Sequence, residues 1–364
     1  MDLNINTPEP AQRKLPLEQE WTEGKPSNKL GIAIVGLGKY STQQLLPALK
    51  ETKSLELKGL VSGSKEKLEK YAKEYNVPSS GLYSYDNFDS IKDNNEIDVV
   101  YIVLPNAMHA EYTIRAAKAG KHVICEKPMA CSVEEAEQMI AACQEAGKRL
   151  FIGYRLHFEP YNLEAMRLGR EKVFGEIKEI RADFGFDVGE ENQWRLRKSL
   201  AGGGSLYDVG IYTIQAARYV TGMEPVSVRN VRIDKSNDKK FKEVECNISW
   251  ELVFPNGIIA KCSSSYSNEI DKLYVRAKDG WFEIAPAFEY EGQKGRSSMG
   301  EIQLDQINQQ AVQMEEMAKA IIRNTHLSCE GEEGLKDMKV IEAIYQAAEQ
   351  DKVVFMEDVK AFQY

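Results

Sequence analysis

Short apolar runs alternate with amphipathic helical segments between residues 30 and 153, and this alternation constrains the fold more than any other feature of the chain. Residues 30–35 and 98–104 are almost continuously apolar, whereas residues 65–75 place their apolar side chains on one stripe of a helix. Strands that are apolar on both faces are typical of a parallel sheet with helices on both sides. The sequence therefore predicts an α/β, doubly wound parallel sheet domain over residues 29–153.

The pattern changes after residue 153. Strand-like segments now alternate polar and apolar residues and are separated by turn sequences such as Pro-Asn-Gly at 255–257. Such strands are typical of a mostly antiparallel sheet. Helical patterns over residues 202–220 and 304–323 interrupt them. We expect residues 154–364 to form a second, α+β domain with a large, mostly antiparallel open sheet.

Residues 1–28 contain four prolines and few large apolar side chains, which predicts an extended Pro-rich N-terminal arm. This segment lacks the apolar core of a signal peptide. We therefore expect a cytoplasmic protein as the sequence is written, or a periplasmic one if an export signal has been removed.

Charge and cysteine content exclude several classes of function. The 364 residues include 56 acidic and 47 basic side chains, and a net charge of −9 argues against a nucleic-acid partner. No apolar run approaches the roughly 18 residues that a membrane span needs. The six cysteines form no C-x-x-C pair and only four histidines accompany them, so we expect no metal site.

A glycine-rich turn, Gly-Leu-Gly-Lys-Tyr-Ser over residues 36–41, follows the first predicted strand. Gly36 allows the tight turn, Gly38 lets a pyrophosphate approach the backbone, and the next helix offers unpaired N–H groups to phosphates. We expect a dinucleotide-binding Rossmann domain. An S-adenosylmethionine-dependent methyltransferase, which has a similar loop, is the alternative.

The end of the second predicted strand indicates which dinucleotide binds. Sites specific for NAD place Asp or Glu there to bind the ribose 2′-hydroxyl. This chain has Ser62, Ser64, Lys65 and Lys67 instead. We expect them to bind a 2′-phosphate, so that the cofactor is NADP(H) rather than NAD. The same residues are also compatible with an ordinary capped helix and solvated lysines.

Three residues indicate acid–base chemistry. Lys127 follows a strand at its carboxyl end, where ligands bind in open α/β sheets. Asp208 and Tyr212 stand four residues apart at the start of a Gly-rich helix and therefore share one face. Together with the free N–H groups of that helix start, they could bind a polyol and exchange a proton with its hydroxyl. Each residue alone is also compatible with a solvated surface position.

These motifs and a few others occur in the order found in a known family. The chain resembles the glucose–fructose oxidoreductase, inositol dehydrogenase and MocA (Gfo/Idh/MocA) superfamily, and within it the glucose–fructose oxidoreductase subfamily. Ser41 and Tyr207 depart from the family pattern, which has a small Ala and an apolar residue there, and the export signal of that subfamily is absent. The motifs that carry the resemblance are residues 36–41, Leu104-Pro105-Asn106 with His109, Glu126-Lys127-Pro128, Gly153-Tyr154-Arg155, Gln193–Arg197 and the Gly-rich block 201–212.

The resemblance implies a role for each matching residue. Tyr212 would be the acid/base, Lys127 would lie near the nicotinamide, and Asp208 would complete the catalytic set. The cofactor-binding residues expected from the loop and the resemblance are Gly36, Gly38, Lys39, Tyr40, Ser62, Ser64, Lys67, Leu104, Asn106, His109, Glu126, Lys127, Arg155, Trp194 and Arg195. The substrate-binding residues expected are Lys127, Arg155, His157, Asp208, Tyr212 and Tyr266. Taken alone, Arg155 and Arg195 could be ordinary ion-pair partners, and His157 could be a partly buried histidine with satisfied hydrogen bonds.

The function expected from this resemblance is oxidation of an aldose such as glucose to its lactone, with hydride transfer to NADP and a second sugar as a candidate hydride acceptor. The alternatives are an inositol, xylose or other polyol dehydrogenase, and a non-catalytic nucleotide-binding regulator. The apolar character of residues 248–253 and 258–262 suggests a sheet face that needs covering. We expect a homo-dimer or homo-tetramer through this sheet, with the N-terminal arm reaching a neighbouring subunit as the resemblance implies.

Overall fold

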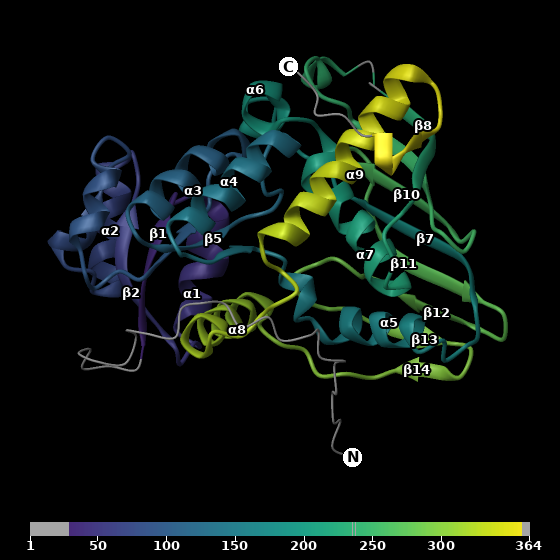
Figure 1. Cartoon of the computed structure of the whole chain (residues 1–364), viewed down its shortest axis with the longest axis horizontal. Coiled ribbons are helices and arrows are strands. Elements are labelled where there is room, and N and C mark those ends of the chain that lie inside the picture. The colour runs from purple at the N-terminus through teal and green to yellow at the C-terminus, as the bar shows by residue number, and fades with distance from the viewer. Residues whose placement is uncertain (1–28, 235, 237, 359–364) are drawn as a thin grey trace.

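The computed structural model describes residues 29–234, 236 and 238–358, and the Pro-rich arm expected over residues 1–28 lies outside this part of the chain. Two sheets, each with its own helices, lie side by side (Figure 1). No helix among the described residues is long and apolar enough to cross a membrane.

The first sheet is six-stranded and fully parallel, with the strand order β3-β2-β1-β4-β5-β6. This order confirms the predicted doubly wound domain. It reverses between β1 and β4, and the carboxyl ends of these two strands therefore flank the crevice where ligands bind in such sheets. The strands are β1 (Leu30–Val35), β2 (Leu55–Val61), β3 (Leu82–Tyr83), β4 (Val99–Ile102), β5 (His122–Cys125) and β6 (Leu150–Ile152).

The apolar character of these strands has a direct structural cause. All six residues of β1 and all four of β4 are buried, because helices pack on both faces of the sheet. Two serines fix the helix starts: Ser64 accepts a hydrogen bond from the Lys67 N–H, and Ser132 accepts one from the Glu135 N–H. The helices of this domain are α1 (Leu46–Leu49), α2 (Lys65–Tyr75), α3 (His109–Lys118) and α4 (Val133–Glu145).

The second sheet is nine-stranded, with the order β14-β13-β12-β11-β7-β10-β9-β8-β15. Only β7 and β10 pair in parallel, so the sheet is mostly antiparallel, as predicted. The strands are β7 (Ile177–Gly185), β8 (Ser227–Asp234), β9 (Asn247–Val253), β10 (Ile259–Ser265), β11 (Ile270–Ala277), β12 (Trp281–Ile284), β13 (Gly295–Ser297), β14 (Gly300–Ile302) and β15 (Val354–Phe355).

Helices cover one face of this sheet and also tie it to the first domain. Helices α5 and α7 pack on the strands, α8 contacts α1 and β2, and α9 contacts α4, β6 and β8. The last two helices therefore return from the second domain to the first. The helices are α5 (Pro160–Arg170), α6 (Lys198–Ala201), α7 (Ile211–Thr221), α8 (Gln309–Arg323) and α9 (Gly331–Gln350).

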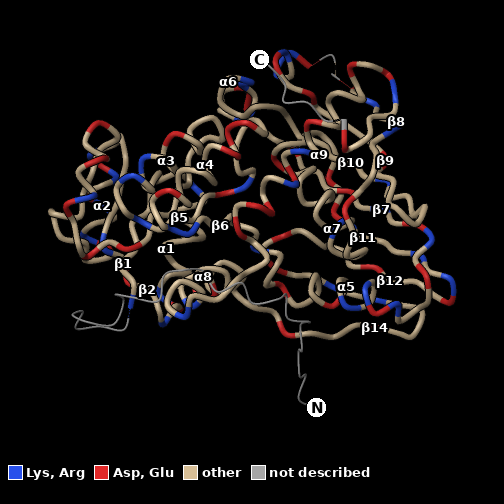
Figure 2. The backbone as a smooth tube through the Cα atoms, in the orientation of Figure 1, with Lys and Arg blue, Asp and Glu red and all other residues tan. Residues whose placement is uncertain are grey.

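The apolar residues that suggested a subunit interface point to this helix-covered face. Ile248, Trp250 and Leu252 of β9 are each at most 2% exposed. The opposite face is charged: Glu179 on β7 pairs with three half-exposed cations, Arg181, Lys261 and Arg276. Acidic and basic residues are interspersed along the strands of the sheet (Figure 2). The expectation that this sheet leaves an apolar face uncovered is therefore wrong, because the helices of the same chain cover it.

The helix predicted over residues 202–220 begins later than expected. Gly202 has a φ of +79°, which ends α6, and the glycines after it form bends rather than helix. A π-helical turn over Leu206–Gly210 then leads directly into α7. This turn places Asp208 and the first residues of α7 at the crevice between the two domains.

Candidate functional site

A cavity of about 550 Å³ lies at the carboxyl ends of β1 and β4, where the start of α7 faces the first domain. A dinucleotide needs a cleft of this kind, one that runs from a glycine turn to polar side chains. The lining residues are Gly36, Leu37, Gly38, Lys39, Tyr40, Ser41, Ser62, Lys67, Tyr85, Val103, Leu104, Pro105, Asn106, Glu126, Lys127, Gln193, Trp194, Arg195, Asp208, Tyr212 and Tyr290.

The glycine turn has the geometry that a pyrophosphate requires. Gly36 has a φ of +95°, and a Cβ atom there would lie 2.3 Å from the carbonyl oxygen of Val103. A Cβ atom at Gly38 would meet nothing within 4 Å, so the backbone at this position is open to the cavity. The Ser41 hydroxyl donates to the Gly36 carbonyl at 2.5 Å, and the family departure at this position therefore stabilises the turn. These residues fit a dinucleotide.

Two of the residues expected to bind a 2′-phosphate line the cavity. Lys67 donates from Nζ to the Leu37 carbonyl at 3.0 Å, and Ser62 lies at the end of β2. Ser64 does not line the cavity, because its hydroxyl caps α2. Lys65 has a 90% exposed side chain and pairs with Glu69 on the helix surface. The basic side chains at the cavity wall are therefore Lys39, Lys67, Lys127 and Arg195.

The three expected catalytic side chains lie together at the other end of the cavity. Lys127 donates from Nζ to Oδ1 of Asp208 at 3.1 Å and to its backbone carbonyl at 2.6 Å. The same Nζ lies 4.8 Å from the centre of the Tyr212 ring. Arg195 donates from Nε to Oδ2 of Asp208 at 2.8 Å, and the Tyr266 hydroxyl donates to this oxygen at 3.2 Å.

This arrangement keeps the ionisable groups in defined charge states. Burial raises the pKa of Asp208, but the charges of Arg195 and Lys127 outweigh it and hold this pKa well below its usual range. Burial lowers the pKa of Lys127, but the oxygens of Tyr212, Asp208 and Glu126 outweigh it and raise this pKa. Asp208 is therefore an anion and Lys127 a cation across the neutral range.

The backbone at the start of α7 is held by a residue that the sequence analysis did not identify. The buried carboxylate of Glu245 accepts hydrogen bonds from the N–H groups of Gly204 and Leu206, each at 3.0 Å. It also accepts one from the Tyr345 hydroxyl at 2.9 Å. The expectation that these helix-start N–H groups bind a polyol is therefore wrong, because Glu245 occupies them.

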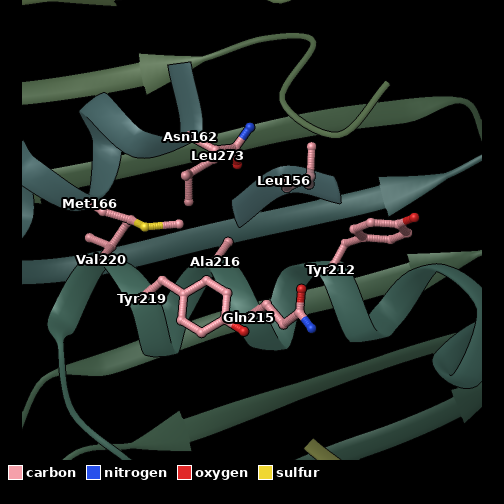
Figure 3. A pocket seen from close by; sticks show the side chains of 9 residues that line it. All are labelled: Leu156, Asn162, Met166, Tyr212, Gln215, Ala216, Tyr219, Val220 and Leu273. Atoms are coloured by element: carbon pink, nitrogen blue, oxygen red, sulfur yellow. The ribbon is translucent and has the colours of Figure 1, made fainter. Parts of the chain in front are cut away.

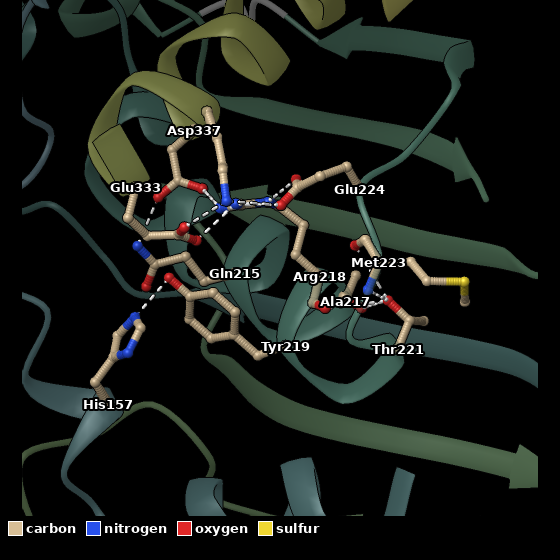
Figure 4. A network of polar contacts seen from close by, with 11 residues as sticks. His157, Gln215, Ala217, Arg218, Tyr219, Thr221, Met223, Glu224, Glu333 and Asp337 are labelled. Atoms are coloured by element: carbon tan, nitrogen blue, oxygen red, sulfur yellow. Dashed lines mark hydrogen bonds and ion pairs between the residues drawn. The ribbon is translucent and has the colours of Figure 1, made fainter. Parts of the chain in front are cut away.

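The far end of α7 is anchored by a buried ion-pair network (Figure 4). Arg218, 1% exposed, pairs with Glu224 and Glu333 at 2.6 Å each and with Asp337. Gln215 donates to Asp337 at 2.7 Å. Because Glu333 and Asp337 belong to α9, the network fixes the helix that carries Tyr212 to the helix that contacts the first domain.

A small cavity of about 10 Å³ lies next to the Tyr212 ring, between α5 and α7 (Figure 3). Leu156, Met166 and Leu273 line it together with polar side chains of α7. A volume of this size is at the lower limit for one water molecule and too small for a ligand. This cavity is therefore a packing gap next to Tyr212, which also lines the nucleotide cavity.

Besides Ser64, four expected site residues do not line the large cavity. The ring nitrogens of His109 lie 2.8 and 2.9 Å from the carbonyl oxygens of Pro128 and Leu104, in the interior. His157 lies 2.6 Å from the Tyr219 hydroxyl, within the region of the Arg218 network (Figure 4). Arg155 and Tyr266 are buried just behind the wall. They contact the cavity-lining residues Tyr212 and Asp208, respectively.

The cavity wall also holds residues that were not expected to bind the cofactor or the substrate. Gln193 belongs to the motif over residues 193–197, which was the signal for it. Tyr85 and Tyr290 lie in connecting segments without any motif, and only the folded chain brings them to the cavity.

Comparison with known proteins identifies the family. Residues 30–154 match the model of the Gfo/Idh/MocA oxidoreductase family with its NAD-binding Rossmann fold, and residues 163–296 match the Gfo/Idh/MocA C-terminal domain. The chain belongs to this family. It is therefore an oxidoreductase, as the sequence predicted, and the methyltransferase alternative is excluded.

Several relatives cover almost the whole chain. The D-xylose 1-dehydrogenase [NADP(+)] of Haloarcula marismortui is 30% identical over 353 residues, which are 92% of this chain and 96% of the relative. The crystal structure of aldose-aldose oxidoreductase from Caulobacter crescentus, complexed with glycerol, is 44% identical with a TM-score of 0.88, over 90% of this chain and 99% of that chain. KijD10, a 3-ketoreductase from Actinomadura kijaniata, is 20% identical with a TM-score of 0.75, over 88% and 98% of the two chains, and shares the fold.

Proposed function

We propose that this protein oxidises the anomeric carbon of an aldose and uses NADP(H) as its redox cofactor. The observation that supports this most strongly is the grouping of Lys127, Asp208 and Tyr212 in the wall of the cavity that begins at the glycine turn. A phenol next to an ammonium group is suited to proton exchange with a sugar hydroxyl, because the cation stabilises the phenolate that forms.

Each of these three residues has its own role in the reaction. The phenolate form of Tyr212 takes the proton from the anomeric hydroxyl and becomes the neutral phenol. Lys127, whose Nζ lies 4.8 Å from the centre of this ring, stabilises the phenolate that accepts the proton. Asp208 fixes the position of Lys127 and accepts a hydrogen bond from the sugar through its remaining lone pairs. NADP, when bound along the glycine turn, supplies the hydride acceptor. The product is an aldonolactone. Incubation of the purified protein with NADP and a panel of aldoses tests this proposal, because absorbance of the reduced cofactor must appear with at least one of them.

NADP is favoured over NAD by two observations. The curated relatives from Haloarcula marismortui and Haloferax volcanii are both named as NADP-using D-xylose dehydrogenases. In this chain the end of β2 carries Ser62 followed by Lys67 on α2, with no acidic side chain at the cavity wall there. Dissociation constants of both cofactors, measured by fluorescence titration, test this preference: equal or tighter binding of NAD would contradict it.

The sugar itself has two supported candidates. The name of the relative from Haloarcula marismortui favours D-xylose. The name of the relative from Caulobacter crescentus favours a pair of aldoses, one of which is oxidised and the other reduced. The two reactions differ in whether they need unbound NADP in solution. A reaction that continues with a sugar acceptor after all unbound NADP has been removed supports an aldose pair, whereas a reaction that stops supports a dehydrogenase that releases its cofactor.

A dimer through the charged face of the second sheet is the oligomer that we propose. This face carries stacked Tyr274 and Trp281, with ring centroids 6.1 Å apart, among its ion pairs. Because most of the side chains on this face that we describe form ion pairs, we expect the contact to weaken as salt rises. Light scattering at low and high ionic strength measures this, and a monomer at all concentrations would contradict the proposal.

A further inference from the structure

Tyr290 is a second phenol in the reaction site, and no motif or family match assigns it a role. It lies in the segment between β12 and β13 and lines the same cavity as Lys127 and Tyr212. The residue is 41% exposed and its neighbours Glu289 and Glu291 are also exposed, whereas Phe288 two residues earlier is buried. The exposed part of Tyr290 lies at the wall of the cavity and is therefore accessible to a ligand.

The backbone that carries Tyr290 is held in place from three sides. Arg155 donates from its guanidinium to the carbonyls of Phe288 and Glu289, the latter at 2.9 Å. Gln309 donates to the Tyr290 carbonyl at 2.8 Å. The Asp271 carboxylate accepts hydrogen bonds from the N–H groups of Ala287 and Phe288, three and two residues before Tyr290, at 2.6 and 2.9 Å. The position of the ring is therefore set by the protein before any ligand binds.

The ring of Tyr290 also makes two contacts that define the shape of the cavity. The Arg155 guanidinium lies between two phenols, 4.5 Å from the Tyr290 ring centre and 5.0 Å from that of Tyr212. The Tyr290 ring also stacks on Tyr40, a residue of the glycine-rich turn, with centroids 5.9 Å apart and an interplanar angle of 28°. Tyr290 thus connects the reacting phenol in one domain to the nucleotide loop in the other.

The Tyr290 hydroxyl remains protonated in the neutral range. Burial and the neighbouring Tyr212 oxygen raise its pKa, while Arg155 and Lys127 lower it, and the result is about 12. A neutral phenol both donates and accepts hydrogen bonds, which suits a sugar hydroxyl. Proton transfer from the sugar is left to Tyr212, which has Lys127 over its ring.

We propose that Tyr290 is a specificity-determining residue that contacts the sugar: its ring closes the sugar subsite beside Tyr40, and its hydroxyl binds a sugar hydroxyl other than the one oxidised. The inference rests on the proposed function, since it concerns the same cavity. A ring at this boundary limits the size of the sugar, so it discriminates between a pentose such as xylose and a hexose such as glucose, which carries an additional hydroxymethyl group.

Two substitutions separate the ring from the hydroxyl. Tyr290→Ala removes both, and we expect KM for the preferred sugar to rise at least tenfold, kcat to change less, and the kcat/KM ratio of hexose to pentose to increase at least fivefold. Tyr290→Phe keeps the ring, so we expect the ratio to return to within twofold of wild type while KM remains raised about threefold or more. Tyr75→Ala is the matched control: this half-buried tyrosine of α2 does not line the cavity, so the substitution should change neither KM nor the hexose-to-pentose ratio.

The outcomes distinguish this inference from the proposed function. If the wild-type protein oxidises no aldose in the panel, the proposed function itself fails. If it does, and Tyr290→Ala lowers kcat/KM by the same factor for pentoses and hexoses, Tyr290 has only a structural role and the inference is overturned. Unchanged KM values in both variants also overturn it. The NADP dissociation constant, measured in parallel, should stay within twofold of wild type; a larger rise would mean that Tyr290 acts through Tyr40 on the nucleotide and not on the sugar.

Discussion

The Nζ atom of Lys127 lies 4.8 Å from the centre of the Tyr212 ring, and these two residues come from different domains. Lys127 follows β5 of the parallel sheet, whereas Tyr212 lies in α7 on the antiparallel one. The ammonium group and the phenol are therefore brought together only when the domains are docked. Anything that moves α7 relative to the first sheet should affect proton transfer before it affects binding of the nucleotide.

Replacing Tyr212 by Phe tests the acid/base assignment. The variant keeps the ring that packs edge-on against Phe184 and loses only the hydroxyl, so we expect it to fold normally. Because a positioned acid/base contributes about 10²–10⁴-fold to a rate, kcat should fall by this factor. The NADP dissociation constant should stay unchanged. Steady-state kinetics and fluorescence titration measure the two quantities, and near-normal turnover would refute the assignment.

Replacing Asp208 by Asn removes the anion that Lys127 and Arg195 share, while the side chain keeps its shape. Asp208 is one of the groups that raise the pKa of Lys127, so this pKa should fall in the variant. The alkaline limb of the pH profile of kcat/KM should then move to lower pH, with a loss of at least tenfold at its optimum. Asp183→Asn, on the charged face of the sheet, is the control. An alkaline limb that stays in place would show that Lys127 does not depend on Asp208.

Lys67 and Lys65 offer a matched pair for cofactor selectivity. Lys67 reaches the cavity and donates to the Leu37 carbonyl, whereas Lys65 is 90% exposed on the same helix. Lys67→Ala should weaken NADP binding by tenfold or more, which corresponds to about 1.4 kcal/mol, and leave NAD binding unchanged. Lys65→Ala should change neither. If Lys67→Ala weakens both cofactors equally, Lys67 does not bind the 2′-phosphate.

Glu245→Gln tests whether the start of α7 depends on its buried carboxylate. The amide keeps one acceptor oxygen and turns an NH₂ group toward the N–H of Gly204 or Leu206, so one donor loses its partner. A buried donor without a partner costs about 1–3 kcal/mol of unfolding free energy. The exposed Glu243, which accepts from the Lys198 N–H, gives the control Glu243→Gln with a smaller loss. Urea unfolding measures the free energy of unfolding of both variants. Equal losses of this free energy would show that Glu245 stabilises the fold no more than the exposed Glu243 does.

The parts of this site that the sequence predicts are those whose geometry is local. The turn at residues 36–41 needs a glycine at position 36 because φ is positive there. The motif can therefore be recognised from six consecutive residues of the sequence. Asp208 and Tyr212 stand four residues apart, and both line the cavity because the π-helical turn that holds Asp208 continues directly into α7. The alternation of apolar strands and helices likewise predicts the parallel sheet, because each strand of such a sheet is covered by helices on both faces.

The parts that the sequence does not reveal depend on contacts between distant segments. Glu245 lies in a segment that reads as a strand, and it acts on Leu206, 39 residues earlier in the chain. Tyr290 is positioned by Arg155, whose hydrogen-bond partner Glu289 lies 134 residues further along. The apolar residues of β9 suggested a subunit interface because no local pattern says which helices return to cover them.

His122 provides a test of how the first domain responds to acid. The side chain is 5% exposed, its Nδ1 atom accepts a hydrogen bond from the Arg149 N–H, and burial together with the nearby Lys148 and Arg149 charges lowers its pKa to about 3. Below pH 6.5 the unfolded chain binds a proton here that the folded chain does not. The folded state therefore loses about 1.4 kcal/mol per pH unit from this group as the pH falls from 6.5 toward 3.

The variant His122→Asn keeps an acceptor near the position of Nδ1 but cannot be protonated. We expect it to be less stable than wild type at pH 8, because the ring is lost from a packed site, and to close this gap as the pH falls to 5. Urea unfolding at pH 8, 6.5 and 5 gives the two free-energy curves. The value at pH 8 isolates the packing cost, so only the change in the gap reports the proton. Parallel curves between pH 6.5 and 5 would show that His122 is protonated in the folded chain as readily as in the unfolded one.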